Sequence, residues 1–321
     1  MTELECCVHW LSVVVESVHE EAYMLYDAFF KDLFGDLQNM DYGGRGFQEI
    51  WMSPLLGFKL YIKPYRQGME YFHFEIPGQA CELISWERFR AFDDELGIAY
   101  ADRYHYTRLD IAFDHAPFTP QDVEDAISNG MVRSLAKRET MTVNKTPFEK
   151  RDNGEEGTHT VNFGSRQSER MIRVYNRRGF TRLEMEMKQK RADLVAKQIF
   201  KEADICLWFP LAMSHLRDYV DFQMPWWDEF THGIGRAKAI VTTPREITIE
   251  RDAAWLERQV AVPLSIVHDV RRDGFVEKLL TLGRKKRMAT NKYDILYGKF
   301  DSQWSEIKKK KEAEEKKHEH E

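Results

Sequence analysis

The feature that most constrains the fold is a run of alternating polar and apolar residues from Thr160 to Arg191. Three short alternating segments are separated there by glycine and charged turn residues, a pattern typical of antiparallel strands. In the second segment Ile172 and Val174 point to one side and Arg173 and Tyr175 to the other, because successive side chains of a strand alternate. The sequence therefore predicts a sheet with one apolar face and one polar face.

The same alternation brings carboxylates onto the polar face of two predicted strands. The third segment of the run places Leu183, Met185 and Met187 on its apolar side. A separate strand, predicted from Tyr106 to Asp114, repeats this pattern. The carboxylates that the two strands direct to the polar side are Asp110, Asp114, Glu184 and Glu186. We predict that this polar side is the functional site.

The order of the predicted elements favours an α+β fold, with a large, mostly antiparallel sheet, flanking helices and a helical C-terminal part. With 321 residues, of which 43% are hydrophobic, the chain can bury one large core or two modest ones. The predicted regions are a core at 1–200, an aromatic-rich connection packing on the core at 201–244, a helical C-terminal region at 245–300, and a charged tail at 301–321.

Three helices have recognisable ends in the sequence. Trp86 to Leu96 has helical periodicity and is followed by Gly97, a residue that commonly ends helices. Thr119 is expected to cap a helix whose first residue is proline. Gly274 to Leu282 is amphipathic, and Gly283 is expected to end it.

Composition limits the class of protein. No apolar run approaches the roughly 20 residues of a membrane helix, and the acidic N-terminus lacks the basic start of a secretory signal. The four cysteines show neither metal-ligand nor disulfide-framework spacing. We therefore expect a cytoplasmic protein with no membrane partner. The net charge of −6 argues against indiscriminate coating of nucleic acid, whereas local basic clusters suit contacts with DNA at chosen places.

Convergence of Asp110, Asp114, Glu184 and Glu186 suggests a metal ion. Carboxylates that approach one another repel unless a cation neutralises them, and oxygen ligands suit Mg²⁺ or Mn²⁺. The alternative is a solvated sheet face on which these carboxylates form ion pairs with Arg and Lys. The pattern by itself leaves both open.

Tyr175 is the candidate nucleophile. It lies among Arg173, Arg177 and Arg178, whose guanidinium groups are expected to hold a phosphodiester and to favour the phenolate. Such a tyrosine, aided by a metal ion, suits transesterification, which conserves phosphodiester energy in a covalent protein–DNA link. The alternative is an ordinary cross-strand pair between tyrosine and arginine.

Further residues are candidates for contact with DNA. Backbone near Gly164 can approach a phosphate closely, and a basic cluster follows the last amphipathic helix, where it would also complement the helix dipole. The predicted DNA-binding residues are Ser165, Arg166, Arg177, Arg178, Lys188, Arg284, Lys285, Lys286 and Arg287. The sequence has no pair of histidines separated by one hydrophobic residue, so it lacks the histidine metal site found in many nicking enzymes.

Several motifs together resemble one family. The segments are 107–114, 163–168, 172–177 and 182–188, with weaker similarity at Trp10–Ser12, Gly78–Cys81 and Trp255–Val260. In this order and spacing, over most of residues 8–290, they resemble the Rep_trans-type rolling-circle replication initiators of plasmids and filamentous phages. Members of that family also lack the histidine pair.

The resemblance implies an activity. Such initiators nick one strand at the plus origin, stay attached to the 5′ phosphate through a tyrosine and leave a 3′ hydroxyl as primer. By resemblance Tyr175 is the nucleophile, with Arg173 beside it, and Asp110 and Glu184, with Glu186 or Asp114, are the metal ligands. The resemblance also makes the region at 1–200 the catalytic nicking core and the helical region at 245–300 a candidate for DNA recognition. Homodimerisation and cooperation with a host helicase are further expectations. Two alternatives remain open: a DNA-binding regulator that does not nick, and a hydrolytic metal nuclease.

Overall fold

The structure is a computed structural model that describes residues 5–66, 68–146, 157–177, 179–237, 253, 256–271 and 274–288. The chain divides into two compact units, Met1–Thr242 and Thr243–Glu321. Each unit is described by itself.

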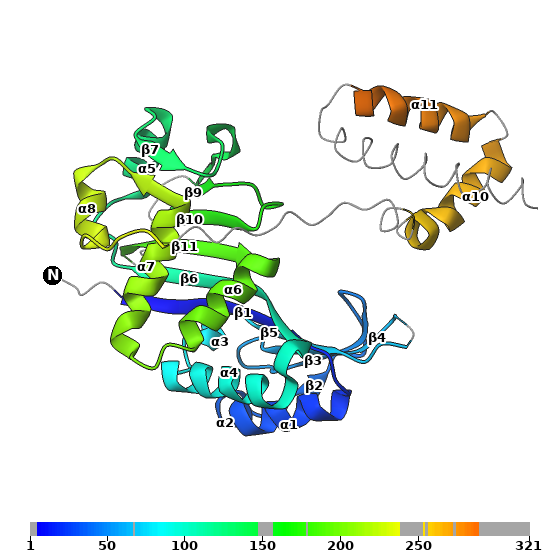
Figure 1. Ribbon diagram of the computed structural model, residues 1–321, viewed down its shortest axis with the longest axis horizontal. Coiled ribbons are helices and arrows are strands. Elements are labelled where there is room, and N and C mark those ends of the chain that lie inside the picture. The colour runs from blue at the N-terminus through cyan, green and yellow to red at the C-terminus, as the bar shows by residue number, and fades with distance from the viewer. Residues whose placement is uncertain are drawn as a thin grey trace, which may run out of the picture. The chain divides into compact units, whose positions relative to one another are not determined.

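The first unit is built on a ten-stranded sheet with the order β2-β3-β4-β5-β1-β6-β11-β10-β9-β8 (Figure 1). Neighbouring strands pair antiparallel throughout this sheet, which confirms the predicted α+β class. The strands are β1 Glu5–Val15, β2 Gln38–Asn39, β3 Phe47–Met52, β4 Lys59–Pro64, β5 Phe72–Ile76, β6 Tyr104–Asp114, β8 Thr142–Lys145, β9 His159–Phe163, β10 Arg170–Arg177 and β11 Phe180–Lys188. The four long strands β1, β6, β11 and β10 are adjacent although β1 and β11 are far apart in sequence.

Helices pack on the apolar face of this sheet. Apolar residues from strands and helices form one continuous buried cluster, which includes Leu109, Ile172 and Met185 from the strands. The helices are α1 His19–Phe29, α2 Lys31–Phe34, α3 Gly78–Cys81, α4 Trp86–Tyr100, α5 Pro120–Ser128, α6 Gln189–Phe200, α7 Trp208–Tyr219 and α8 Pro225–Thr231. The opposite face of the central strands is left for polar side chains, as the alternation predicted.

Local sequence explains where some helices begin and end. Thr119 caps α5 through a capping box with Asp122, and Pro120 is its first residue, as predicted. The prediction that Gly97 ends α4 is wrong: the helix runs to Tyr100, and the residue with positive φ that follows it is Ala101. Burial of Leu96 and Tyr100 in the core outweighs the modest helix penalty of one glycine.

The aromatic-rich segment after α6 packs on the same core. Trp227 and Phe230 of α8 are fully buried and contact Phe118. A small two-stranded sheet of β12 Val220–Phe222 and β7 Val132–Ser134 ties this segment to the chain after α5. The core thus continues through at least Phe230.

The described part of the second unit consists of a π-helical turn at Leu256–Val260 and the helices α10 Ala261–Arg271 and α11 Phe275–Met288. The prediction that Gly283 ends a helix is wrong, because α11 continues beyond it. The predicted tail at 301–321 lies outside the described residues. Among the residues that are described, no helix has both the length and the apolar character needed to cross a membrane.

Candidate functional site

Strand register brings the predicted site residues together on the polar face. Between β10 and β11, Arg173 lies opposite Glu184 and Tyr175 opposite Arg182. Between β11 and β6, Glu186 lies opposite Asp110. Side chains at directly opposed positions lie about 5 Å apart at their Cβ atoms, so pairing alone joins residues that are over 60 positions apart in the sequence.

Three of the four predicted carboxylates form one cluster. Asp110, Glu184 and Glu186, hereafter the carboxylate cluster, are almost completely buried, and Asp110 has no exposed surface. Arg108 donates from Nε to Oδ1 of Asp110 over 2.9 Å and from Nη2 to Oδ2 over 2.6 Å. The same Nη2 lies 3.0 Å from Oε2 of Glu186. Arg108 therefore binds Asp110 through a two-point fork, the strongest geometry available to this pair.

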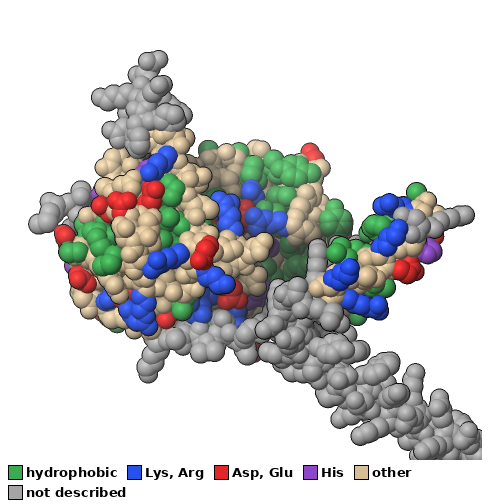
Figure 2. Space-filling model, turned by 90° about the horizontal axis from the view of Figure 1, so that it is seen from above, with side chains coloured by type: hydrophobic (Ala, Val, Ile, Leu, Met, Phe, Trp, Pro, Cys, Tyr) green, Lys and Arg blue, Asp and Glu red, His purple; other side chains and the backbone are tan. Residues whose placement is uncertain are grey.

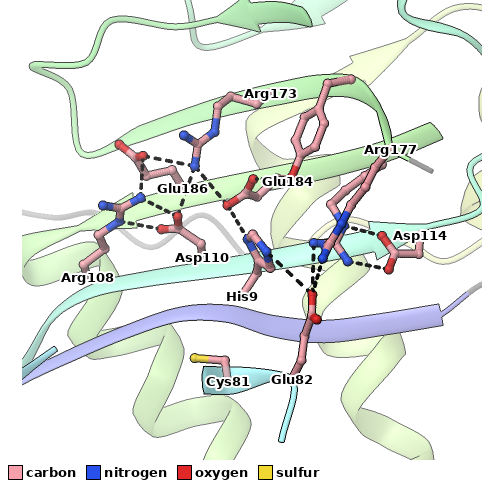
Figure 3. Close-up of polar contacts among 12 residues, drawn as sticks. His9, Cys81, Glu82, Arg108, Asp110, Asp114, Arg173, Arg177, Glu184 and Glu186 are labelled. Atoms are coloured by element: carbon pink, nitrogen blue, oxygen red, sulfur yellow. Dashed lines mark hydrogen bonds and ion pairs between the residues drawn. The ribbon is translucent and has the colours of Figure 1, made fainter. Parts of the chain in front are cut away.

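Arg173 lies at the centre of the carboxylate cluster (Figure 3). Its Nη2 is 2.9 Å from Oε1 of Glu184, 3.2 Å from Oδ2 of Asp110 and 3.5 Å from Oε2 of Glu186. One nitrogen thus contacts an oxygen of each carboxylate. The two guanidinium groups provide the positive charge that the sequence analysis assigned either to a metal ion or to ion pairs.

The donor set of the carboxylate cluster suits a hard divalent ion in chemical type, because all of its members are carboxylates. As arranged here, however, no group of three or more His, Cys, Asp or Glu side chains within the described part of the chain is placed to hold a metal ion. Arg173 lies between the carboxylates instead. Metal binding would therefore require Arg173 to move.

His9 is a member of the site that the sequence analysis missed. Its Nδ1 lies 3.0 Å from Oε1 of Glu184, which joins β1 to β11 across β6. Burial acts to raise the pKa of Glu184, but the hydrogen bond with His9 and the positive charge of Arg173 outweigh it and lower that pKa. The neighbouring Trp10–Ser12 motif was a signal that this segment matters, although nothing in it pointed to His9.

The pKa of Asp110 is shifted in the opposite direction to that of Glu184. Burial raises its pKa, and the negative charges of Glu184 and Glu186 raise it further, while Arg108 opposes both effects. Two carboxylates of one cluster thus have pKa values shifted in opposite directions, an arrangement common at reactive sites.

Tyr175 is half-buried, and its hydroxyl donates to Oε2 of Glu184 over 3.2 Å. Burial and the negative charge of Glu184 raise its pKa to about 12, although the charge of Arg182 on the paired strand acts to lower it. The prediction that surrounding guanidinium groups favour the phenolate is therefore wrong for this structure. The reason is that Arg173 contacts the carboxylates and Arg177 contacts Glu82, not the phenol.

Asp114 belongs to a second group of ions. Arg182 binds both of its carboxylate oxygens, from Nη2 over 2.6 Å and from Nε. Glu82 lies 2.8 Å from Nη2 of Arg177 and 3.7 Å from Nη1 of Arg182. Asp114 is four residues from Asp110 along β6, about 13 Å at the usual rise of a strand. The structure therefore places it apart from the carboxylate cluster.

The predicted DNA-contact residues lie in different places. Ser165 and Arg166 are exposed in the β9–β10 loop, and the backbone oxygen of Arg166 accepts a hydrogen bond from Nζ of Lys188 over 3.0 Å. Lys188 also pairs with Oε1 of Glu186 at 2.5 Å, so the loop borders the carboxylate cluster. On the face of the first unit in Figure 2, Lys and Arg side chains lie interspersed with Asp and Glu side chains.

The remaining predicted DNA contacts lie in the second unit or outside the described residues. Arg178 lies outside the described residues. Arg284 and Lys285 are exposed on α11 in the second unit, and the side chains of Lys286 and Arg287 are outside the description. Their contact with DNA stays a prediction.

Comparisons with known proteins agree with this architecture. A family model described as replication initiation factor (Rep_trans) matches residues 105–281, more than half of the chain. A solved structure of a rolling-circle replication initiator protein from Geobacillus stearothermophilus resembles the fold with a TM-score of 0.54 at 20% sequence identity. The similarity covers 74% of this chain and 93% of that one. No curated protein sequence matches the chain.

Proposed function

The chain belongs to the replication initiation factor family, and on this premise we propose that it starts rolling-circle replication by nicking one strand of origin DNA with Tyr175. The observation that carries the proposal is the position of the Tyr175 hydroxyl, 3.2 Å from Glu184 on the polar face of the central sheet. Because the phenol is half-buried and not enclosed in the core, a phosphodiester can reach it from the open side.

The proposed reaction is a transesterification. The Tyr175 oxygen attacks phosphorus, the bond from phosphorus to the 3′ oxygen breaks, and a bond from the tyrosine oxygen to the 5′ phosphate forms. The phenol proton passes to Glu184, its hydrogen-bond acceptor, and the departing 3′ oxygen takes up a proton from water to become the primer hydroxyl. The reverse reaction rejoins the strand at termination without an energy cofactor.

The pKa values define how Glu184 can act. The pKa of Tyr175 is raised to about 12, while that of Glu184 is lowered from the usual value of a carboxyl group. Complete proton transfer before attack is therefore strongly unfavourable at neutral pH. Glu184 acts best as a fixed acceptor that orients the phenol and receives the proton as the bond to phosphorus forms.

We propose Mg²⁺ or Mn²⁺ as the cofactor, held by Asp110, Glu184 and Glu186. When bound, such an ion supplies Lewis-acid polarisation of a phosphate oxygen. The other roles belong to side chains of the protein. Glu184 orients the phenol, and the charge of Arg182, on the paired strand, opposes the rise in the pKa of Tyr175.

The proposed partner is origin DNA, single-stranded or in a hairpin at the nick site. The exposed Ser165 and Arg166, together with Lys188, border the carboxylate cluster and are proposed to contact the DNA backbone. Homodimerisation and cooperation with a host helicase are proposed as well, from resemblance to the family.

The test is incubation of the full-length protein with a labelled single-stranded oligonucleotide carrying the origin of its own replicon, in the presence of Mn²⁺. Formation of a covalent protein–DNA adduct that is lost in Tyr175→Phe supports the proposal. Tyr61→Phe is a matched control, because the Tyr61 hydroxyl also donates to a buried carboxylate, that of Glu75 at 3.5 Å, and its pKa is likewise raised to about 12.

The other outcomes each point to a different function. Cleavage without an adduct, unchanged in Tyr175→Phe, would mean that the protein is a hydrolytic metal nuclease. Binding without cleavage would mean that it is a DNA-binding regulator. Equal loss of the adduct in Tyr61→Phe and Tyr175→Phe would remove the special role of Tyr175.

A further inference from the structure

We propose that Arg173 is an exchangeable counter-ion: its guanidinium group holds the centre of the carboxylate cluster and leaves it when a divalent cation binds, so that it becomes free to take the DNA phosphate. This inference rests on the proposed function for the identity of the site. It concerns what one arginine of the chain does before and after the ion enters.

The first support is the contrast between the two arginines. Arg108 uses Nε and Nη2 on the two oxygens of Asp110, and its guanidinium lies 4.2 Å from the ring of Trp10. It is therefore fixed by a fork and by a cation–π contact. Arg173 makes its three carboxylate contacts through Nη2 alone, while its buried Nε has no hydrogen-bond partner.

The second support is the cost of this position for Arg173. A buried donor without a partner loses hydration without a compensating hydrogen bond, which disfavours this position of Arg173. The side chains of Arg173 and Arg108 reach solvent to nearly the same extent, 25% and 23%, so the difference between them lies in how each is held. Arg173 is thus the weakly held cation of the pair, and Arg108 is the firmly bound one.

The third support is charge balance. Among the described residues, the carboxylate cluster already contacts three permanently charged side chains, Arg108, Arg173 and Lys188, besides the imidazole of His9. Adding a divalent ion while Arg173 stayed in place would add two positive charges at short range and would set a guanidinium against the ion. Departure of Arg173 removes one positive charge. Like charges a few ångströms apart in a buried site repel strongly, so exchange is the favoured outcome.

Once it has left the carboxylates, Arg173 is free to bind a DNA phosphate. It lies two residues before Tyr175 on β10, and both side chains point to the polar face. A guanidinium released to the open side is placed to bind a phosphate oxygen beside the tyrosine, since arginine recognises phosphate through charge-assisted hydrogen bonds. Binding of the cation and binding of the DNA phosphate would then be positively coupled through this side chain.

The test is titration of the full-length protein, without DNA, with Mn²⁺ followed by electron paramagnetic resonance. Arg173→Gln removes the competing charge, so its Mn²⁺ affinity is expected to rise on the order of tenfold over the wild type, a change that corresponds to about 1.4 kcal/mol. Lys188→Gln is the matched control. It removes one positive charge from the same cluster, but from the outer oxygen of Glu186, and it is expected to change Mn²⁺ affinity much less.

The second readout is DNA binding in a background that cannot nick, Tyr175→Phe. Mn²⁺ is expected to strengthen binding of a single-stranded oligonucleotide to this protein, and addition of Arg173→Gln is expected to remove that gain. If Arg173→Gln does not fold, Arg173→Lys takes its place. An ammonium group is more strongly hydrated than a guanidinium group, so it should leave the carboxylates more readily, and a rise of a few-fold in Mn²⁺ affinity is expected.

Three results would overturn the inference: equal rises in Mn²⁺ affinity in the Arg173 and Lys188 variants, unchanged or weaker affinity in the Arg173 variant, or no Mn²⁺ binding in any variant. The titration contains no DNA, so it is separate from nicking. Tighter Mn²⁺ binding without adduct formation would support the exchange and count against the nicking proposal.

Discussion

The substitution Asp114→Asn tests whether the Arg182–Asp114 ion pair is independent of the carboxylate cluster. The Arg182–Asp114 pair is buried, with side-chain exposures of 3% and 10%, and the arginine binds both carboxylate oxygens. Removing one partner of a buried pair typically costs 3–5 kcal/mol. Arg182 keeps Glu82 at 3.7 Å as a second partner, which favours the lower end of that range. We therefore expect a loss of about 3 kcal/mol, or a fall in Tm of roughly 6–12 °C for a unit of this size.

The assay compares two chemically identical changes on one strand. Asp114→Asn and Asp110→Asn are made in the full-length protein, and thermal unfolding is followed by circular dichroism beside Mn²⁺ titration by electron paramagnetic resonance. Asp114→Asn is expected to lower Tm but to keep Mn²⁺ binding, because Asp114 lies apart from the carboxylate cluster. Asp110→Asn is expected to lose Mn²⁺ binding, because it removes a proposed ligand.

Two results would refute this reasoning. Loss of Mn²⁺ binding in a folded Asp114→Asn protein would place Asp114 among the ligands. A change in Tm of less than about 2 °C, below what even 1 kcal/mol gives a domain of this size, would mean that the Arg182 pair contributes little to stability.

Three further predictions concern other parts of the first unit. Glu184→Gln is expected to abolish adduct formation while oligonucleotide binding measured by fluorescence anisotropy persists, and full cleavage by this variant would contradict the role of Glu184. Burial, with the charge of Arg45, lowers the pKa of His73 to about 3 in the folded protein. The unfolded value is about 6.5, so protonation of His73 favours the unfolded chain. The stability contributed by neutral His73 is therefore complete at neutral pH and is lost as pH falls from about 6.5 toward 3, by up to about 1.4 kcal/mol per pH unit. Melting at pH 7 and pH 5 should therefore show a smaller drop in His73→Phe than in the wild type, and equal drops would contradict the assignment. Thr119→Ala removes the capping box of α5 and is expected to cost about 1 kcal/mol, seen as a fall in Tm of roughly 2–4 °C, with Thr119→Ser largely unchanged.

Alternation of residue types was enough to predict the sheet. The period of two in β6, β10 and β11 assigned each side chain to a face, because strand geometry leaves no other choice. The cap at Thr119 was predictable for the same reason, since its determinants lie within four residues. The helix ends expected at Gly97 and Gly283 were wrong, because in both cases the helix continues past the glycine.

The sequence by itself determined which residue types share the polar face: a tyrosine, its arginines and its carboxylates. Strand order and register decided which of them meet. As a result, Arg173 lies among the carboxylates, Asp114 pairs with Arg182, and His9 of β1 contacts Glu184. Side-chain alternation is a property of a single strand, whereas a contact between strands, and the pKa shift that follows from it, depends on chain segments that meet only in the folded sheet.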